Sequence, residues 1–202
     1  TYNEFSNIEL IVNKINSLNI EEKYNYFFID DNSNDGSREE FAKLKNIHKN
    51  FNYKVRKASS RDLTQSIIYA LKFINTKYVI ILDCDLQHDI KSIPEMIDHL
   101  IYKKFELVIG CRNINRIHKT SRRYTSYFGI LLTKTIGIKN LKDPLSGFFG
   151  LKTEDFKKVS PLIKSRGYKI LLSLIFYLSR DIMIKEIDIN FFERKREKSK
   201  LN

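Results

Sequence analysis

Cysteine is scarce in this sequence, and long apolar runs are absent. The 202 residues include only two cysteines, too few for a disulfide scaffold, and no zinc-binding spacing is present. The longest apolar stretch, residues 170–178, is far below the roughly 20 residues that a membrane-spanning helix needs. We therefore expect a reduced cytosolic protein without a disulfide framework, a zinc site, a spanning helix in this stretch or a signal peptide.

Length and charge narrow the class further. Hydrophobic residues make up 42% of the chain, enough to bury a full core, most simply as a single domain over residues 1–202. The formal net charge of +12 favours anionic partners: a nucleotide, a phospholipid surface or nucleic acid. Because neither a basic-aromatic RNA signature nor a helix-turn-helix pattern is visible, we expect no nucleic-acid partner.

Strand and helix patterns alternate along the chain. Apolar spacing predicts a helix over residues 8–18, and an aromatic run predicts a strand over 24–29. Ser37 and Glu40 have the spacing of a capping box, which predicts a helix from Ser37 towards Lys49. Further strands are expected at 53–55, 79–82, 107–110 and 183–189. Further helices are expected at 67–74, 93–101 and 168–178, and one more helix is expected to end near Val159. This alternation predicts an α/β fold with a mostly parallel, doubly wound sheet and helices on both faces.

The β-branched run at 79–82 ends in two carboxylates one residue apart, Asp83 and Asp85. Such a run is typical of a strand buried on both faces, and parallel sheets bind ligands beyond the carboxyl ends of their strands. Hard oxygen ligands favour Mg²⁺ or Mn²⁺ over zinc, so we expect a divalent cation next to a diphosphate. The alternative is that an aspartate here only caps the helix that starts near Lys91.

Four segments occur in an order that one protein family shares. They are Ile29-Asp-Asp31 with Asp35-Gly36, Asp83-Cys-Asp85-Leu-Gln87, Asp143-Pro-Leu-Ser-Gly-Phe-Phe149 and Ser199-Lys-Leu-Asn202. Each motif alone is degenerate, but their joint order and spacing are specific. In these segments, and over essentially its whole length, the chain resembles the family-two glycosyltransferases of GT-A fold. It is most similar to the dolichol-phosphate mannose synthases and related polyprenyl-phosphate sugar transferases.

The resemblance implies a metal-dependent, inverting transfer of a sugar from a nucleotide diphosphate to a polyprenyl (dolichyl) phosphate. The enzyme would work peripherally on the cytosolic membrane face, with GDP-mannose as the favoured donor and UDP-glucose next. The first strand and the leading proline of the family pattern are missing from the sequence, which starts inside the opening motif. A continuation beyond Asn202 into transmembrane helices, as in many relatives, stays open.

The resemblance also assigns site residues. The nucleotide-sugar positions are Tyr2, Glu4, Ile29, Asp31, Asp83, Cys84, Asp85, Arg194 and Lys200. The metal positions are Asp83, Asp85 and Gln87. The catalytic positions are Asp85, Arg112, Arg122, Ser126 and Asp143. Arg122 and Ser126 would receive the acceptor phosphate, for which an arginine fork is better suited than a lysine.

Several alternatives stay open at this point. An ionised phosphate acceptor needs positioning more than a base, whereas a glycan hydroxyl would need a carboxylate base, for which Asp143 is the candidate. Asp143 also fits a plain turn before two core phenylalanines. Asp62 and Glu197 replace glycines of the family pattern, so a catalytically silent nucleotide-binding module is a third function. Residues 122–138 fit either a basic amphipathic helix on lipid headgroups or a core helix.

The remaining motifs have plainer interpretations as well. The turn after Ile29 also fits an Asx-rich loop that caps a helix, and the arginines after Cys111 fit a solvated basic loop. The basic stretch from Arg194 to Lys200 fits a solvated chain end.

Overall fold

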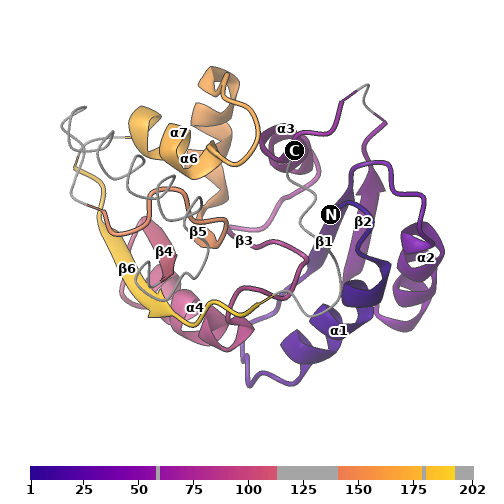
Figure 1. Ribbon diagram of the computed structural model, residues 1–202. Coiled ribbons are helices and arrows are strands. Elements are labelled where there is room, and N and C mark those ends of the chain that lie inside the picture. The colour runs from indigo at the N-terminus through magenta and orange to yellow at the C-terminus, as the bar shows by residue number, and fades with distance from the viewer. Residues whose placement is uncertain (58–59, 113–140, 179–180, 194–202) are drawn as a thin grey trace.

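Two β-sheets form the centre of the computed structural model, which describes residues 1–57, 60–112, 141–178 and 181–193 (Figure 1). A two-stranded parallel sheet pairs β1 (Tyr26–Asp30) with β2 (Phe51–Val55). A second sheet has the order β3-β5-β4-β6. Its strands are β3 (Tyr78–Ile81), β4 (Leu107–Arg112), β5 (Phe149–Lys152) and β6 (Ile184–Ile189). Only β5 runs against its neighbours, so the predicted mostly parallel sheet is confirmed.

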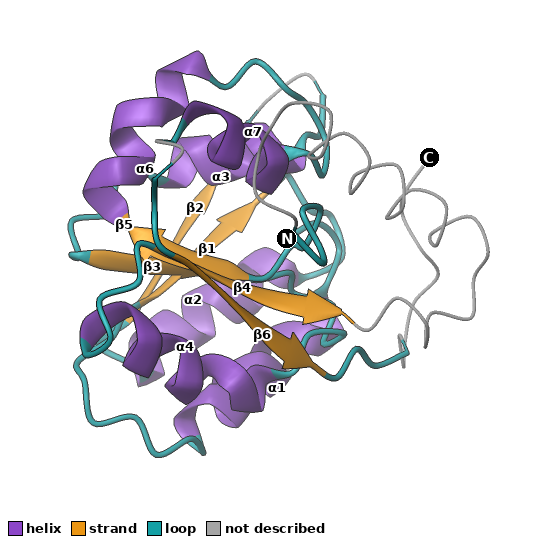
Figure 2. Ribbon diagram, turned by 90° about the vertical axis from the view of Figure 1, so that its left-hand side faces the viewer, coloured by secondary structure: helices purple, strands orange, loops and turns teal. Residues whose placement is uncertain are grey.

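Helices cover both faces of the sheets, as predicted (Figure 2). One layer consists of α1 (Phe5–Asn16), α2 (Ser37–Ile47) and α4 (Ile93–Ile101), which follows the short 3₁₀ helix η1 (Ile90–Ser92). The other layer consists of α3 (Leu63–Ala70), α6 (Thr153–Val159) with the 3₁₀ helix η3 (Ser160–Leu162), and α7 (Ile170–Tyr177). Each layer therefore buries one face of the strands.

Alternating side chains of the second sheet divide between two hydrophobic cores. Val108 and Phe148 pack into the core under α1, α2 and α4, whereas Leu107, Ile109 and Phe149 pack into the core under α6 and α7. Because side chains of successive strand residues point to opposite faces, one strand serves both cores. The expectation that Phe148 and Phe149 are core residues is confirmed, since both are fully buried.

The predicted capping box at Ser37 and Glu40 is wrong. Gly36, at φ +93°, occupies the N-cap, and Ser37 is already the first residue of α2. The backbone amide and hydroxyl of Ser37 donate to Asp35 Oδ1 at 3.1 and 2.5 Å, and the amide of Phe5 donates to Asp35 Oδ2 at 2.9 Å. The amide of Glu40, which the serine was expected to serve, donates instead to the carbonyl of Gly36 at 3.2 Å.

Several predicted residues lie outside the described part of the chain. They are Arg122, Ser126, the segment 122–138, Arg194, Glu197 and Lys200. Within the described ranges, no helix is long and apolar enough to cross a membrane.

Candidate functional site

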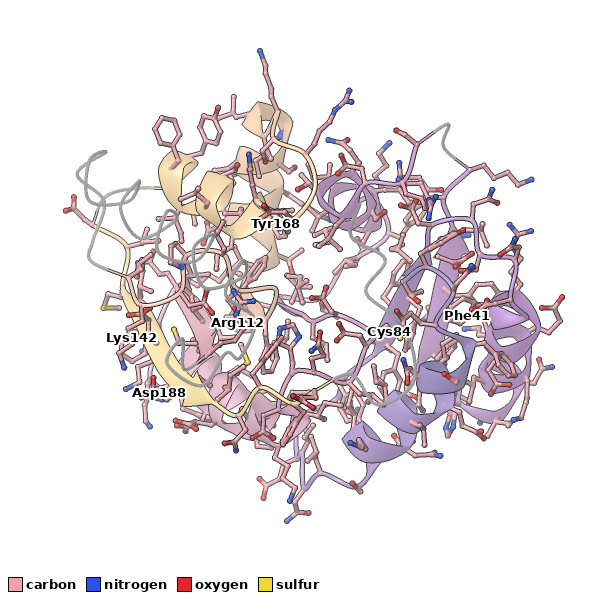
Figure 3. The ribbon with its side chains drawn as sticks, viewed as in Figure 1. Phe41, Cys84, Arg112, Lys142, Tyr168 and Asp188 are labelled. Carbon is pink, nitrogen blue, oxygen red and sulfur yellow. The ribbon has the colours of Figure 1, made fainter. Side chains whose placement is uncertain are left out.

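The carboxyl ends of three strands carry the predicted site residues. Asp31 follows β1, Asp83 and Asp85 follow β3, and Arg112 ends β4. Figure 3 shows Arg112 and Cys84 towards the middle of the molecule, between the two sheets. This is the edge at which sheets of this type bind ligands.

The segment after β3 folds back on itself. The Asp85 side chain is buried, and its Oδ1 accepts the backbone amide of Gln87 at 3.1 Å. Asp89, not Asp83 or Asp85, caps the following helical turn by accepting the amide of Lys91. The interpretation of the carboxylate pair as helix caps is therefore wrong for these two residues.

Asp83 has an environment that disfavours its negative charge. Burial raises the pKa of Asp83 above the ordinary aspartate value, and the charge of Asp85 adds to the rise, although His88 and Arg112 oppose it. Gly147 packs directly against this carboxylate, because a Cβ there would lie 2.7 Å from Asp83 Oδ2. A cation beside Asp83 and Asp85 would offset their repulsion.

His88 is a residue for which the sequence predicted no role. Its side chain is buried against the rings of Phe148 and Phe191, at centroid distances of 5.4 and 5.6 Å. Its Nδ1 has no hydrogen-bond partner among the described residues. Burial lowers the pKa of His88 below the ordinary histidine value despite Asp83, so the ring is neutral at neutral pH.

Arg112 and Asp143 form a two-pronged ion pair. Arg112 Nε donates to Asp143 Oδ2 at 2.7 Å, and Nη2 donates to Asp143 Oδ1 at 2.8 Å. Asp143 is fully buried, and the backbone amide of Arg112 also donates to it at 3.2 Å. Burial alone would lower the pKa of Arg112, but its bonds to Asp143 outweigh burial and raise it. With both oxygens engaged, Asp143 is poorly placed to act as a general base.

The oxygen ligands after β3 suit a hard divalent cation. Gln87 Nε2 donates to the carbonyl of Phe192 at 3.0 Å, which leaves the side-chain oxygen of Gln87 to serve as a ligand. Two carboxylates and an amide oxygen are the donor set that Mg²⁺ or Mn²⁺ prefers. No group of three His, Cys, Asp or Glu side chains suited to a metal occurs in the described ranges, so the fit depends on Gln87 as the third ligand.

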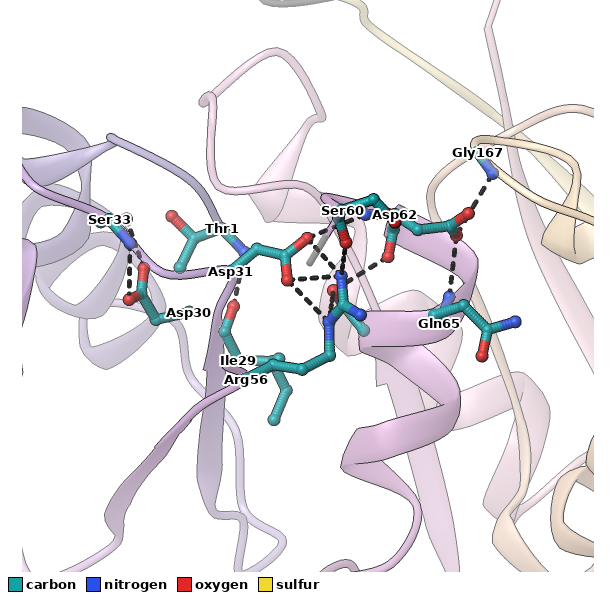
Figure 4. Close-up of polar contacts among 11 residues, drawn as sticks. Thr1, Ile29, Asp30, Asp31, Ser33, Arg56, Ser60, Asp62, Gln65 and Gly167 are labelled. Carbon is teal, nitrogen blue, oxygen red and sulfur yellow. Dashed lines mark hydrogen bonds and ion pairs between the residues drawn. The ribbon is translucent and has the colours of Figure 1, made fainter. Parts of the chain in front are cut away.

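Asp31 is held by a partner that the sequence did not predict. Arg56, just beyond β2, donates from Nε and Nη2 to the two Asp31 oxygens at 2.6 and 2.8 Å (Figure 4). The backbone amide of Asp62 adds a third hydrogen bond to Asp31, at 2.9 Å. The carboxylate predicted to contact the nucleotide thus has a fixed orientation.

Asp62 has a structural role in this network. Its Oδ1 accepts the backbone amides of Gln65 at 3.0 Å and Gly167 at 3.3 Å, so Asp62 is the N-cap of α3. The hydroxyl of Thr64 donates to the carbonyl of the same Gly167 at 2.7 Å. These bonds fasten the loop before α7 to α3 (Figure 4). The side chain that replaces a family glycine is therefore engaged in capping.

Tyr2 and Ile29 lie on the same side as Asp31. The guanidinium of Arg61 stands over the ring of Tyr2, 4.2 Å from the centroid. The carbonyl of Ile29 accepts a hydrogen bond from the backbone nitrogen of Thr1, the neighbour of Tyr2, at 2.6 Å. Both predicted residues therefore neighbour the network of Asp31.

Glu4 and Cys84 are two further predicted residues that the structure describes. Glu4 is buried and accepts the side-chain amide of Asn7 at 2.6 Å. Cys84 packs against the core under α1, and burial raises the pKa of its thiol to about 12. The thiol is neutral at neutral pH, so we expect any contribution of Cys84 to a ligand to come from its backbone.

Residues 1–160 match the family described as glycosyl transferase family 2. The chain is 30% identical over 215 residues to a dolichol-phosphate mannosyltransferase of Saccharomyces cerevisiae, an alignment that covers 100% of this chain and 78% of that protein. It is 27% identical over 208 residues to the protein of the same name from Pyrococcus furiosus, covering 100% of this chain and 57% of that protein. The chain thus spans little more than half of the Pyrococcus relative.

Solved structures share the fold. Glucosyl-3-phosphoglycerate synthase from Mycobacterium tuberculosis, in complex with Mn²⁺, UDP and glucosyl-3-phosphoglycerate, superposes with a TM-score of 0.71. The superposition covers 98% of this chain and 70% of that chain at 16% sequence identity. The predicted GT-A fold is confirmed by this likeness.

Proposed function

The chain belongs to glycosyl transferase family 2, and we propose that it transfers mannose from GDP-mannose to a polyprenyl phosphate such as dolichyl phosphate, with inversion at the anomeric carbon. UDP-glucose is the second donor. The names of the curated relatives support the sugar and the acceptor. The observation that carries the proposal is the position of Arg112: its guanidinium is held by both oxygens of Asp143, and its charge acts on Asp83.

Asp83, Asp85 and Gln87 would hold Mg²⁺ or Mn²⁺ on the donor side. When bound, the cation would neutralise charge that develops on the leaving nucleoside diphosphate. Arg194 and Lys200 are the proposed partners that close over the donor phosphates. Asp31, fixed by Arg56, would contact the nucleoside, together with the neighbouring Tyr2 and Ile29.

On the acceptor side, Arg112 would act with Arg122 and Ser126 to bind the lipid phosphate. The acceptor oxygen is already ionised at neutral pH, so its attack requires alignment more than proton removal. Asp143 then positions Arg112, and its engagement by the guanidinium favours a phosphate acceptor over a glycan hydroxyl. The role of Asp62 as a helix cap weakens the argument for a silent module that was based on its charge.

A lipid acceptor requires the protein to work at a membrane, and the net charge of +12 suits the anionic cytosolic leaflet. We therefore place the protein peripherally on the cytosolic membrane face. Residues 122–138 are one proposed contact with the headgroups.

The test measures nucleoside diphosphate release and sugar-lipid formation with GDP-mannose or UDP-glucose, with Mn²⁺ or Mg²⁺, and with polyprenyl phosphate or a glycan as acceptor. We expect lipid product with polyprenyl phosphate, a cation requirement, and faster turnover of GDP-mannose. Product formed only on the glycan would favour the hydroxyl acceptor. Tight, cation-dependent nucleotide binding without turnover would favour the silent module.

A further inference from the structure

The helix α7 and the loop before it have an unusual composition. Residues 156–178 include five lysine or arginine residues and no aspartate or glutamate. The same stretch ends in a nearly continuous apolar run, 170–178. Cations and large apolar side chains are therefore combined in a stretch that contains no acidic residue of its own.

The outward face of α7 carries two exposed aromatic side chains. Its inward face buries four aliphatic side chains, those of Ile170, Leu171, Leu174 and Ile175. At helical spacing, the opposite face consists of Lys169, Leu172, Ser173, Phe176 and Tyr177. Phe176 is 53% exposed and Tyr177 is 38% exposed. A surface helix normally places polar residues on its outward face, so the exposed Phe176 and Tyr177 are a departure from that pattern.

Cations gather at the beginning of α7. Lys164, Arg166 and Lys169 are exposed and have no carboxylate partner within the described ranges. The other two cations of the stretch are engaged: Lys157 donates to the carbonyl of Ile74, and Lys158 pairs with Glu154 and Asp155. The three unengaged cations lie within six residues of the chain, in the loop before α7, and face solvent.

The loop that carries these cations is fixed in place. The amide and carbonyl of Gly167 are bonded to Asp62 and Thr64, and the hydroxyl of Ser173 donates to Ser165 at 2.7 Å. Since Asp62 also donates to Asp31, the basic end of α7 adjoins the donor side of the site (Figure 4). The exposed Phe176 and Tyr177 lie at the other end of α7.

We propose that this surface, consisting of Lys164, Arg166, Lys169, Phe176 and Tyr177, docks onto an anionic lipid bilayer. The inference rests on the proposed function, because that function requires a lipid acceptor. Aromatic side chains with one polar end settle at the headgroup level, and lysine and arginine contact anionic headgroups. An aromatic and basic face without acids has the chemistry of interfacial helices. Docked in this way, the donor side of the site lies next to the leaflet that holds the acceptor.

The first test is sedimentation of the full chain with vesicles of phosphatidylcholine, alone or mixed with phosphatidylserine. We expect binding that requires phosphatidylserine and weakens with salt. The double variant Phe176→Ser/Tyr177→Ser should bind about tenfold more weakly. The triple variant Lys164→Gln/Arg166→Gln/Lys169→Gln should bind about a hundredfold more weakly.

Matched controls change the opposite helical layer. Ile47 and Tyr102 are 60% and 63% exposed, so Ile47→Ser/Tyr102→Ser removes the same kind of exposed apolar surface. Lys14→Gln/Lys23→Gln/Lys49→Gln removes the same charge. Both controls should bind vesicles like the wild type. Equal losses in the control variants, or normal binding by the α7 variants, would overturn the proposal, as would a change of oligomeric state in the α7 variants.

A second assay separates this inference from the proposed function. The α7 variants should turn over a short, water-soluble polyprenyl phosphate like the wild type, but lose turnover of a long-chain acceptor in vesicles. If the wild type uses neither acceptor while the α7 variants still lose vesicle binding, the docking surface stands and the proposed function fails. If the wild type is active and the α7 variants use vesicles normally, the docking surface fails.

Discussion

Two arginine–carboxylate pairs of similar geometry lie at the edge of this fold. Arg56 and Asp31 follow the two-stranded sheet, and Arg112 and Asp143 lie beside the four-stranded sheet. The shortest N–O distances are 2.6 and 2.7 Å. In the proposed function, the carboxylate Asp31 contacts the ligand in the first pair. In the second pair, the arginine Arg112 contacts the ligand.

The surroundings of the two pairs explain this difference. Asp31 accepts a third hydrogen bond from the backbone of Asp62, so its orientation depends on the loop before α3. Arg112 lies over the ring of Phe191 at 5.4 Å and near the carboxylate Asp83, so its charge is directed to the strand edge. The same two-pronged contact can thus orient a negative charge, that of Asp31, or a positive charge, that of Arg112, towards a ligand. Substitutions in the first pair should affect donor binding, and those in the second should affect the chemical step.

The largest effect on turnover is expected at Asp85, in the segment after β3. Asp85→Asn should lower kcat by about a thousandfold, because the cation loses a carboxylate ligand while the hydrogen bond to Gln87 can persist. Turnover and circular dichroism of the purified variant check this. The control Asp89→Asn alters a nearby carboxylate that caps a 3₁₀ helix and accepts the side-chain amide of Asn190, and it should retain activity. Wild-type turnover in Asp85→Asn would show that the metal assignment is wrong.

Arg112→Lys should lower kcat by about a hundredfold, since a lysine cannot form the fork. Asp143→Asn should destabilise the fold by about 3–5 kcal/mol, because a largely buried arginine loses its partner. Steady-state kinetics and denaturant unfolding measure the two effects. The exposed pair of Lys142 and Asp188, at 3.0 Å, is the control: Lys142→Gln should cost less than about 1 kcal/mol. If Asp143→Asn and Lys142→Gln cost equal free energies of unfolding, the buried pair would be no more important for stability than the exposed one.

The cation should change how stability depends on pH. The pKa of Asp83 is raised in the folded state, so the metal-free protein should lose stability as pH rises above the ordinary aspartate pKa. Mn²⁺ should reverse this loss, by about 2.7 kcal/mol at roughly a hundred times its dissociation constant. Thermal melts across pH with and without Mn²⁺ test the prediction. Asp83→Asn should remove both effects, and their persistence in this variant would exclude Asp83 as their source.

A smaller and different effect is expected in the first pair. Asp31→Asn should raise the KM of the nucleotide sugar about tenfold with little change in kcat, because the lost contact is made equally in the ground and transition states. The control Arg38→Lys changes an exposed arginine, 3.9 Å from Asp30, and should leave KM unchanged. A fall in kcat for Asp31→Asn at constant KM would place this residue in the chemical step.

The smallest effect concerns Asp62. Asp62→Ala should destabilise the protein by about 1 kcal/mol through loss of the α3 cap, whereas Asp62→Asn should be nearly neutral because asparagine caps equally well. Donor affinity measured by calorimetry should be the same for Asp62→Asn and the wild type. Tighter donor binding in Asp62→Asn would mean that the carboxylate does repel the diphosphate.

Patterns local in sequence predicted much of the fold. The helical spacing of Ile8, Ile11, Val12 and Ile15 identified the buried face of α1, and all four are buried. The apolar run before Asp83 placed this residue at a strand's end. These features depend on periodicity and chain order, which one sequence contains. Strand β5 was not predicted, because four residues that include Gly150 carry little periodic signal.

Contacts between distant residues were harder to predict. Arg56 and Asp31 are 25 residues apart, and Gly167 and Asp62 are 105 residues apart. Such pairs depend on how the elements pack, which no local pattern specifies. The same holds for His88, whose burial results from rings on two other segments. The sequence therefore predicted that residues such as Asp31, Asp83 and Arg112 lie at the strand ends. It did not predict the residues that hold them there, such as Arg56.

The configuration of the lipid product reports how the sugar is transferred. In the proposed function, a phosphate oxygen of the acceptor attacks the anomeric carbon in line, without a covalent sugar-enzyme intermediate. From GDP-mannose, whose mannose is α-linked, we expect a β-linked mannosyl phosphate, identified by nuclear magnetic resonance of the purified lipid. An α-linked product, or nucleotide release without any sugar-lipid, would contradict it.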